Sequence, residues 1–283
     1  MRRLVMSLAV VLGVVAFGGA EGAGAATGAP YYLSLGDSLA QGVQPNASGQ
    51  SVITNQGYAD DLYSLERFQV RGLRLAKLGC PGETTTTMIE GGICNGVYAS
   101  GNQLDDAVAF LQTHHVALVT LDIGANDVDG CVAGGTISAS CVAAGITTAG
   151  KELATILQRL RAAAPGVPIV GMNYYDPFLA EWLQGSAGQT IAQQSVQLTT
   201  VFNGVLDSDY EAFSVPVADV ASSFQTTNFT PIPFLGLPVD VGAICTLTWM
   251  CAPAPVGPNI HANAAGYWVI AGTFARKIGR LTG

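Results

Sequence analysis

Short apolar segments alternate with longer segments of helical spacing along most of the chain. The apolar segments, typical of buried strands, are 31–35, 70–78, 116–123, 167–173 and 215–220. The segments with helical spacing and few helix breakers are 58–67, 103–113, 142–164, 188–212 and 262–280. This alternation predicts a mainly parallel sheet of five strands covered by helices on both faces. Functional residues of such sheets lie beyond the carboxyl ends of the strands, so we expect them in the loops after the first three strands.

Composition limits the kind of protein that this sheet can belong to. The chain has 283 residues, of which 49% are hydrophobic and 11% charged, so it can form one large domain with a full core. The net charge of -8 includes only 12 lysines and arginines, which are scattered along the sequence. Phosphate groups need clustered basic side chains, and we therefore expect neither a nucleic acid nor an anionic membrane as partner.

The N-terminus reads as a secretion signal that is not part of the fold. Arg2 and Arg3 precede an apolar stretch at 4–17, and small residues at 23–26 form a cleavage site. A retained transmembrane anchor is the alternative, but the apolar stretch is shorter than the roughly 20 residues that a span needs. We predict a signal peptide at 1–25 and a single secreted domain at 26–283, without stable membrane insertion.

Six cysteines in the mature part fall into three pairs that are close in sequence. Secretion makes disulfides their default state, and each pair brackets one irregular loop. The alternative of a zinc site lacks CxxC spacing and nearby histidines. We predict the pairs Cys80 with Cys94, Cys131 with Cys141, and Cys245 with Cys251.

The loops after the first and second strands carry candidates for nucleophilic catalysis. The first loop reads Gly36-Asp37-Ser38-Leu39, in which the serine hydroxyl can be exposed on a tight turn or can merely cap a helix. The second loop contains Gly82, which lets the backbone N–H approach a ligand or simply serves a turn. A phosphate-binding loop is disfavoured there because its lysine is missing.

The loop after the third strand and the histidines complete the set. Asn126 can donate its amide to a developing oxyanion, or it can form an Asx-turn. The chain has three histidines, and His114 and His115 lie at the amino end of the third strand, away from the catalytic edge. His261, just before the last helical segment, is therefore the only plausible general base.

Together, these residues resemble the sequence blocks of the SGNH hydrolases, also called the GDSL lipase/esterase family. Ser38 lies in an intact Gly-Asp-Ser-Leu block, and Gly82, Asn126 and His261 match the second, third and fifth blocks in order. The paired cysteines are similar to those of the secreted actinobacterial branch. The resemblance implies a three-layer, flavodoxin-like α/β/α domain that hydrolyses acyl esters.

The resemblance also implies roles for these residues. His261 takes the proton of Ser38, whose oxygen attacks the ester carbonyl, and the oxyanion is held by the N–H groups of Ser38 and Gly82 and the amide of Asn126. No metal or organic cofactor is needed. We expect a monomer that acts on a small-molecule or lipid ester, and we expect activity to rise through pH about 6–7 as the histidine loses its proton.

One position departs from the family pattern. The family places an aspartate three residues before the histidine, and this chain has Pro258 there. We expect the main-chain carbonyl of Pro258 to orient His261 in a Ser–His dyad, in preference to Asn259, with Asp240 as the fallback carboxylate.

Substrate class and activity leave alternatives open. A polysaccharide O-acetylesterase of the same family and a non-catalytic secreted binding protein are the alternatives to a serine esterase or lipase. A metal-dependent deacetylase is disfavoured because it needs a larger set of histidine and aspartate ligands. The apolar, proline-rich segment 229–238 is a candidate wall of an acyl pocket, or else a buried connection.

Overall fold

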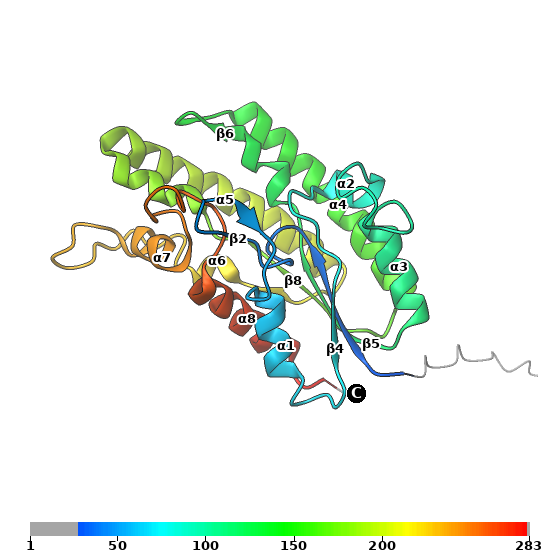
Figure 1. Cartoon of the computed structure of the whole chain (residues 1–283). Helices are drawn as coiled ribbons and strands as arrows, with labels where there is room; N and C mark the ends of the chain where they lie inside the picture. The colour runs from blue at the N-terminus through cyan, green and yellow to red at the C-terminus, as the bar shows by residue number, and fades with distance from the viewer. Residues whose placement is uncertain (1–27, 282–283) are drawn as a thin grey trace, which may run out of the picture.

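The computed structural model describes residues 28–281, and its centre is a five-stranded parallel sheet (Figure 1). The strands are β1 (Tyr31–Gly36), β4 (Arg74–Lys77), β5 (Val116–Asp122), β8 (Ile169–Met172) and β9 (Val217–Ala218). They lie in the order β4-β1-β5-β8-β9, and every pair is parallel. Counted along the chain, this is the 2-1-3-4-5 order of the flavodoxin-like fold, so the predicted fold class is confirmed.

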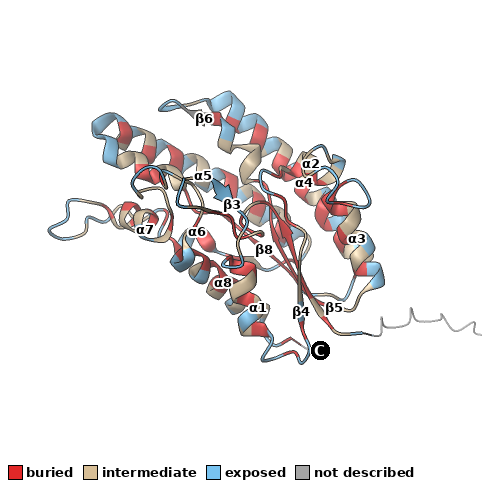
Figure 2. Ribbon diagram, viewed as in Figure 1, coloured by how far each residue is buried: buried red, intermediate tan, exposed pale blue. Residues whose placement is uncertain are grey.

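Long helices cover both faces of the sheet, as the alternation predicted. On one face α1 packs against α8, and on the other α3 and α5 pack against α4 (Figure 1). The bounds of these five helices are α1 (Tyr58–Glu66), α3 (Gln103–Thr113), α4 (Ala139–Ala163), α5 (Ser186–Ala212) and α8 (Ala264–Ile278). The central strands and the inner sides of the helices are buried (Figure 2), so the core runs through the whole domain.

Shorter elements, which the periodicity did not predict, lie mostly near the carboxyl edge of the sheet. The helical ones are α2 (Thr85–Glu90), η1 (Ala125–Asp127), η2 (Asp129–Cys131), η3 (Pro177–Gln184), α6 (Val220–Ser223) and α7 (Val239–Leu247). Two small hairpins pair β2 (Gln44–Pro45) with β3 (Ser51–Val52), and β6 (Val132–Ala133) with β7 (Thr136–Ile137).

The three predicted disulfides are all present. Cys80 bonds to Cys94, Cys131 to Cys141, and Cys245 to Cys251, and none of the six cysteines, all within residues 28–281, is free. Each bond closes a short loop, which restricts the unfolded chain and contributes about 2–3 kcal/mol. The disulfides anchor irregular segments that the sheet itself does not hold.

The sequence predicted a signal peptide and no stable membrane insertion. The predicted signal peptide at 1–25 lies outside the described residues. Within residues 28–281, no helix is both long and apolar enough to cross a bilayer.

The segment 229–238 is neither a wall of an acyl pocket nor a buried connection. It is a loop between α6 and α7 that projects from the domain, with Phe234 fully exposed and Leu235 67% exposed. Its two ends are held against the domain: the Phe229 ring lies 5.9 Å from that of Trp182, and Pro238 is buried. No residue of this loop lines the cavities described below.

Candidate active site

The catalytic candidates lie at the point in the sheet where the strand order reverses. Chain connections leave β1 and β5, which are neighbours in the sheet, toward opposite sides, and this opens a crevice at their carboxyl ends. Ser38 follows β1 and Asn126 follows β5, and His261 reaches the same place from the loop before α8. Sequence motifs more than 200 residues apart are therefore brought to one site.

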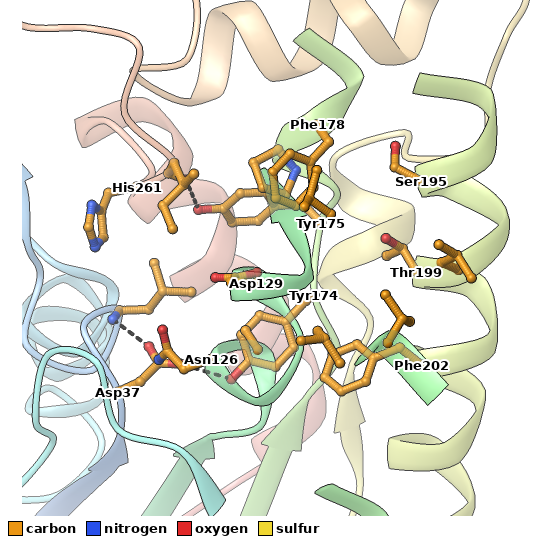
Figure 3. A pocket seen from close by; sticks show the side chains of 18 of the residues that line it. Asp37, Asn126, Asp129, Tyr174, Tyr175, Phe178, Ser195, Thr199, Phe202 and His261 are labelled. Carbon is orange, nitrogen blue, oxygen red and sulfur yellow. Dashed lines mark hydrogen bonds between the residues drawn. The ribbon is translucent and has the colours of Figure 1, made fainter. Parts of the chain in front are cut away.

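Two cavities meet at these residues. The first, named the larger cavity, has a volume of about 810 Å³ including its open mouth, against about 570 Å³ for the second measured in the same way. Figure 3 shows the side chains around the larger cavity. Its apolar lining includes Val128, Val142, Tyr174, Phe178, Leu198 and Phe202. Ser38, Asn126 and His261 line both cavities, and Gly82 lines the second. An ester bond placed at Ser38 would therefore have space on both sides.

The turn that carries Ser38 is fixed by a glycine that no other residue can replace. Gly36 has a φ of +133°, and a Cβ on it would lie 1.9 Å from the backbone oxygen of Asp122. The side chain of Gln103 clamps this glycine, accepting from its N–H at 2.7 Å and donating to its carbonyl at 2.9 Å. The tight contact with β5 sets the direction in which Ser38 leaves the sheet.

Two buried carboxyl groups lie behind Ser38. Asp37 accepts hydrogen bonds from the Leu39 N–H at 2.9 Å and from the Tyr174 hydroxyl at 3.2 Å. Asp122 accepts one from the Tyr58 hydroxyl. Burial, followed by repulsion from Asp37, raises the pKa of Asp122 well above its usual value. Asp122 also accepts the backbone N–H of Ala40 at 3.1 Å, so the pair organises the turn rather than attacking substrate.

Two backbone donors near Ser38 are free. Within residues 28–281, neither the Ser38 N–H nor the Gly82 N–H has a hydrogen-bond acceptor. Asn126 donates one amide hydrogen to the carbonyl of Glu83 at 2.9 Å, which leaves its second hydrogen available. Ser38, Gly82 and Asn126 all line the second cavity, and donors of this kind can stabilise an oxyanion.

His261 is held by an amide oxygen. Its Nδ1 lies 2.7 Å from Oδ1 of Asn259, and the same oxygen accepts the backbone N–H of His261 at 3.1 Å. Because an amide oxygen only accepts, Nδ1 carries the hydrogen and Nε2 is left unprotonated. Burial lowers the pKa of His261 to about 4. The ring is therefore neutral and able to accept a proton over the ordinary pH range.

This contact corrects the expectation for Pro258. The asparagine folds back in an Asx-turn, which occupies Nδ1 and leaves no place for the proline carbonyl. Pro258 itself is exposed. The fallback residue Asp240 is buried in α7, where its Oδ1 accepts the N–H of Val241, and nothing in residues 28–281 links it to His261.

The pH profile tests this environment. With an uncharged ester, kcat/KM should fall on acidification with a midpoint near pH 4, because protonation removes the base. The sequence alone suggested about 6–7, the range of a hydrated histidine. Steady-state rates across pH 3–8, in buffers of constant ionic strength, measure the midpoint; a value of 6–7 would contradict the burial of the ring.

Several residues of the site carried no recognisable sequence signal. Asp122, Gln103 and Tyr174 meet the catalytic turn only through the tertiary fold. The role of Asn259 could have been predicted more easily, since an asparagine two residues before a histidine can form an Asx-turn onto it. His114 lies away from the site, as expected, and stacks on Phe110 with ring centroids 4.0 Å apart.

Comparisons with known proteins agree with this fold and family. A family model described as GDSL-like lipase/acylhydrolase matches residues 34–269. An extracellular lipase from Streptomyces rimosus has a similar structure, with a TM-score of 0.55 and 17% identity over 88% of this chain and 100% of the lipase. Phospholipase A1 from Streptomyces albidoflavus NA297 is also similar, with a TM-score of 0.53 and 18% identity over 88% of this chain and 100% of the phospholipase. A search of curated proteins gives no match. Because the family model spans most of the sequence, the chain belongs to the GDSL-like lipase/acylhydrolase family.

Proposed function

We propose that this protein is a secreted serine esterase or lipase that hydrolyses carboxylic esters through an acyl-enzyme on Ser38. The observation that carries the proposal is the convergence of a serine, a neutral histidine and three free donors on one cavity. Membership of the family supports the same reaction. The three disulfides support an oxidising, extracellular location.

The proposed reaction proceeds in two halves. Nε2 of His261 takes the proton of the Ser38 hydroxyl as Oγ attacks the ester carbonyl, and the resulting oxyanion accepts from the Ser38 and Gly82 N–H groups and Asn126. The imidazolium then protonates the leaving alcohol. Water, activated by the same ring, attacks the acyl-enzyme and releases the acid and the free serine.

Asn259 replaces the usual carboxylate in this scheme. Its amide oxygen holds the tautomer of His261 in which Nε2 is unprotonated, and it interacts with the imidazolium as a neutral dipole. Among residues 28–281 no carboxylate is hydrogen-bonded to the ring, in keeping with its low pKa.

The experiment that tests the function uses the purified mature protein, residues 26–283. It should hydrolyse 4-nitrophenyl esters, and a series from acetate to decanoate would measure how much acyl chain the cavities accept. Activity should persist in EDTA, because every proposed step uses only side chains, backbone and water. Failure to hydrolyse any ester of the series would contradict the proposal.

A pair of substitutions tests the role of Asn259. Asn259→Ala should lower kcat about 10- to 100-fold, the value of a hydrogen bond to a charged group. Asp240→Asn, the control for a remote acid, should leave kcat within about threefold, whereas loss of a true triad acid costs about 10⁴-fold.

A third variant separates orientation from mere packing at this position. Asn259→Asp should move the acidic limb of the pH profile to higher pH, because an anion beside the ring favours the imidazolium. An unchanged midpoint in Asn259→Asp, or full activity in Asn259→Ala, would refute the role.

A further inference from the structure

A carboxyl group that the proposed reaction does not use faces the larger cavity. Asp129 begins η2, which the disulfide of Cys131 anchors to α4. Figure 3 shows its carboxyl between Tyr174 and Tyr175, on the inner side of the cavity that His261 also lines. A group in this place would touch the substrate rather than the scaffold.

Asp129 lacks the partners that its acidic neighbours have. Asp176 accepts hydrogen bonds from the Ser195 hydroxyl at 2.6 Å and the Phe178 N–H at 2.9 Å, and Asp37 accepts the two described above. Within residues 28–281, no group donates to the carboxyl of Asp129. Burial, then repulsion from Asp37 and Asp176, raises its pKa to about 7. The described residues that line the cavity therefore supply neither a donor nor a positive charge to this carboxyl.

The rest of the cavity lining favours a positive charge. No lysine or arginine of the described residues lines it, although two aspartates do. Four of the lining side chains are aromatic: Tyr174, Tyr175, Phe178 and Phe202. Aromatic rings together with a carboxylate are the groups that bind alkylammonium cations with little water. A neutral hydroxyl could hydrogen-bond to Asp129 but would leave its charge uncompensated.

We propose that Asp129 is a specificity-determining residue, and that the larger cavity binds an ammonium-type cationic group of the ester substrate. This inference rests on the proposed esterase function and narrows its substrate class. The cation can belong to the alcohol or to the acyl group, since the cavities lie on both sides of Ser38. The chemistry of recognition is the same in the two cases.

Isosteric ester pairs isolate the charge from size and shape. For the alcohol side, choline acetate is compared with 3,3-dimethylbutyl acetate, in which carbon replaces the nitrogen. For the acyl side, the 4-nitrophenyl ester of 4-(trimethylammonio)butyrate is compared with that of 5,5-dimethylhexanoate. In at least one pair, kcat/KM of the cationic ester should exceed that of its neutral isostere about 10- to 100-fold at pH 8.

Asp129→Asn tests whether that preference depends on the carboxyl. The ratio of cationic to neutral kcat/KM should fall to within about threefold of unity, because asparagine keeps the shape and removes the charge. Asp61→Asn is the matched control: it makes the same change on α1, outside the cavities, and should keep the ratio. Thermal unfolding of both variants checks that the fold is intact.

The pH dependence provides a second, independent readout. The cationic-to-neutral ratio should rise through about pH 7 as Asp129 ionises and should be flat in Asp129→Asn. The other titratable groups that face Asp129 are Asp37, Asp176, His261 and the hydroxyls of Tyr174 and Tyr175. Their titration affects both members of a pair, and the ratio cancels a common effect on catalysis.

The outcomes distinguish this inference from the proposed function. Hydrolysis of the neutral esters without a cationic preference in either pair would overturn the role of Asp129 and leave the esterase function standing. A preference that survives in Asp129→Asn would also overturn it. No hydrolysis of any of the four esters, together with failure of the alkanoate series, would instead refute the esterase function on which the inference rests.

Discussion

Ser38→Ala should lower kcat for 4-nitrophenyl esters by about 10³-fold or more, with the fold unchanged. The hydroxyl is the atom that bonds to the acyl group in the proposed reaction, and no other side chain at the meeting point of the two cavities can replace it. Residual turnover would come from the oxyanion donors and from water activated by His261. Steady-state kinetics on purified protein measure the loss directly.

A matched serine and a covalent label make this test specific. Ser64→Ala removes an exposed hydroxyl on α1 that donates to the backbone oxygen of Asp60, and it should leave the rate unchanged. A fluorophosphonate should add to the peptide containing Ser38 in the wild type and to no peptide in Ser38→Ala, as mass spectrometry would show. Wild-type activity in Ser38→Ala, or labelling elsewhere, would contradict the acyl-enzyme mechanism.

The long elements could be predicted because their patterns are local. A central parallel strand such as β5 is buried on both faces, so it appears as an uninterrupted apolar run. Helices such as α4 and α5 cover the sheet with one side only, which imposes helical spacing over more than 20 residues. These two signals suffice for the layer arrangement.

The short elements could not be predicted, for physical reasons that differ between them. α2 contains three threonines in six residues, a poor helical composition, and its start depends on reciprocal hydrogen bonds between Thr84 and Thr87. α7 is apolar on nearly all sides, so no face stands out in its sequence. The strand predicted at 215–220 is present as β9, but it is shorter than expected: it pairs with β8 only at Val217 and Ala218, because strand length depends on the neighbour.

The residues of the site also fall into two groups: those that short sequence motifs predict and those that only the tertiary fold brings to the site. Ser38, Gly82, Asn126 and His261 lie in short motifs at predicted element ends, and the flavodoxin-like strand order brings such ends together. The prediction that the Pro258 carbonyl orients His261 was wrong. It was based on the position where the family has an aspartate, whereas the Asx-turn of Asn259 places its side-chain oxygen against Nδ1 of His261. Nothing in the sequence indicates that buried Asp122 or Gln103 supports the turn from elements distant in the chain.

Asn126→Ala should lower kcat by about 10²- to 10³-fold while KM changes little, as expected for loss of one oxyanion donor. The effect falls on kcat and not on KM because a neutral ester carbonyl accepts only a weak hydrogen bond from this amide, whereas the oxyanion of the transition state accepts a strong one. The substitution also removes the hydrogen bond to the carbonyl of Glu83, which costs about 1 kcal/mol of stability. Asn95→Ala, which removes an exposed asparagine side chain, is the control for the loss of an amide.

Comparison of kcat with thermal stability then separates the two roles of Asn126. If the amide only anchored the loop that carries Gly82, kcat would recover in conditions that restore stability, such as a lower temperature or added sucrose. If it donates to the oxyanion, the defect in kcat persists at every temperature at which the variant is folded, because the missing donor is part of the transition state. A variant that is folded and has wild-type kcat would reduce Asn126 to a turn residue, leaving the Ser38 and Gly82 N–H groups as the whole oxyanion hole.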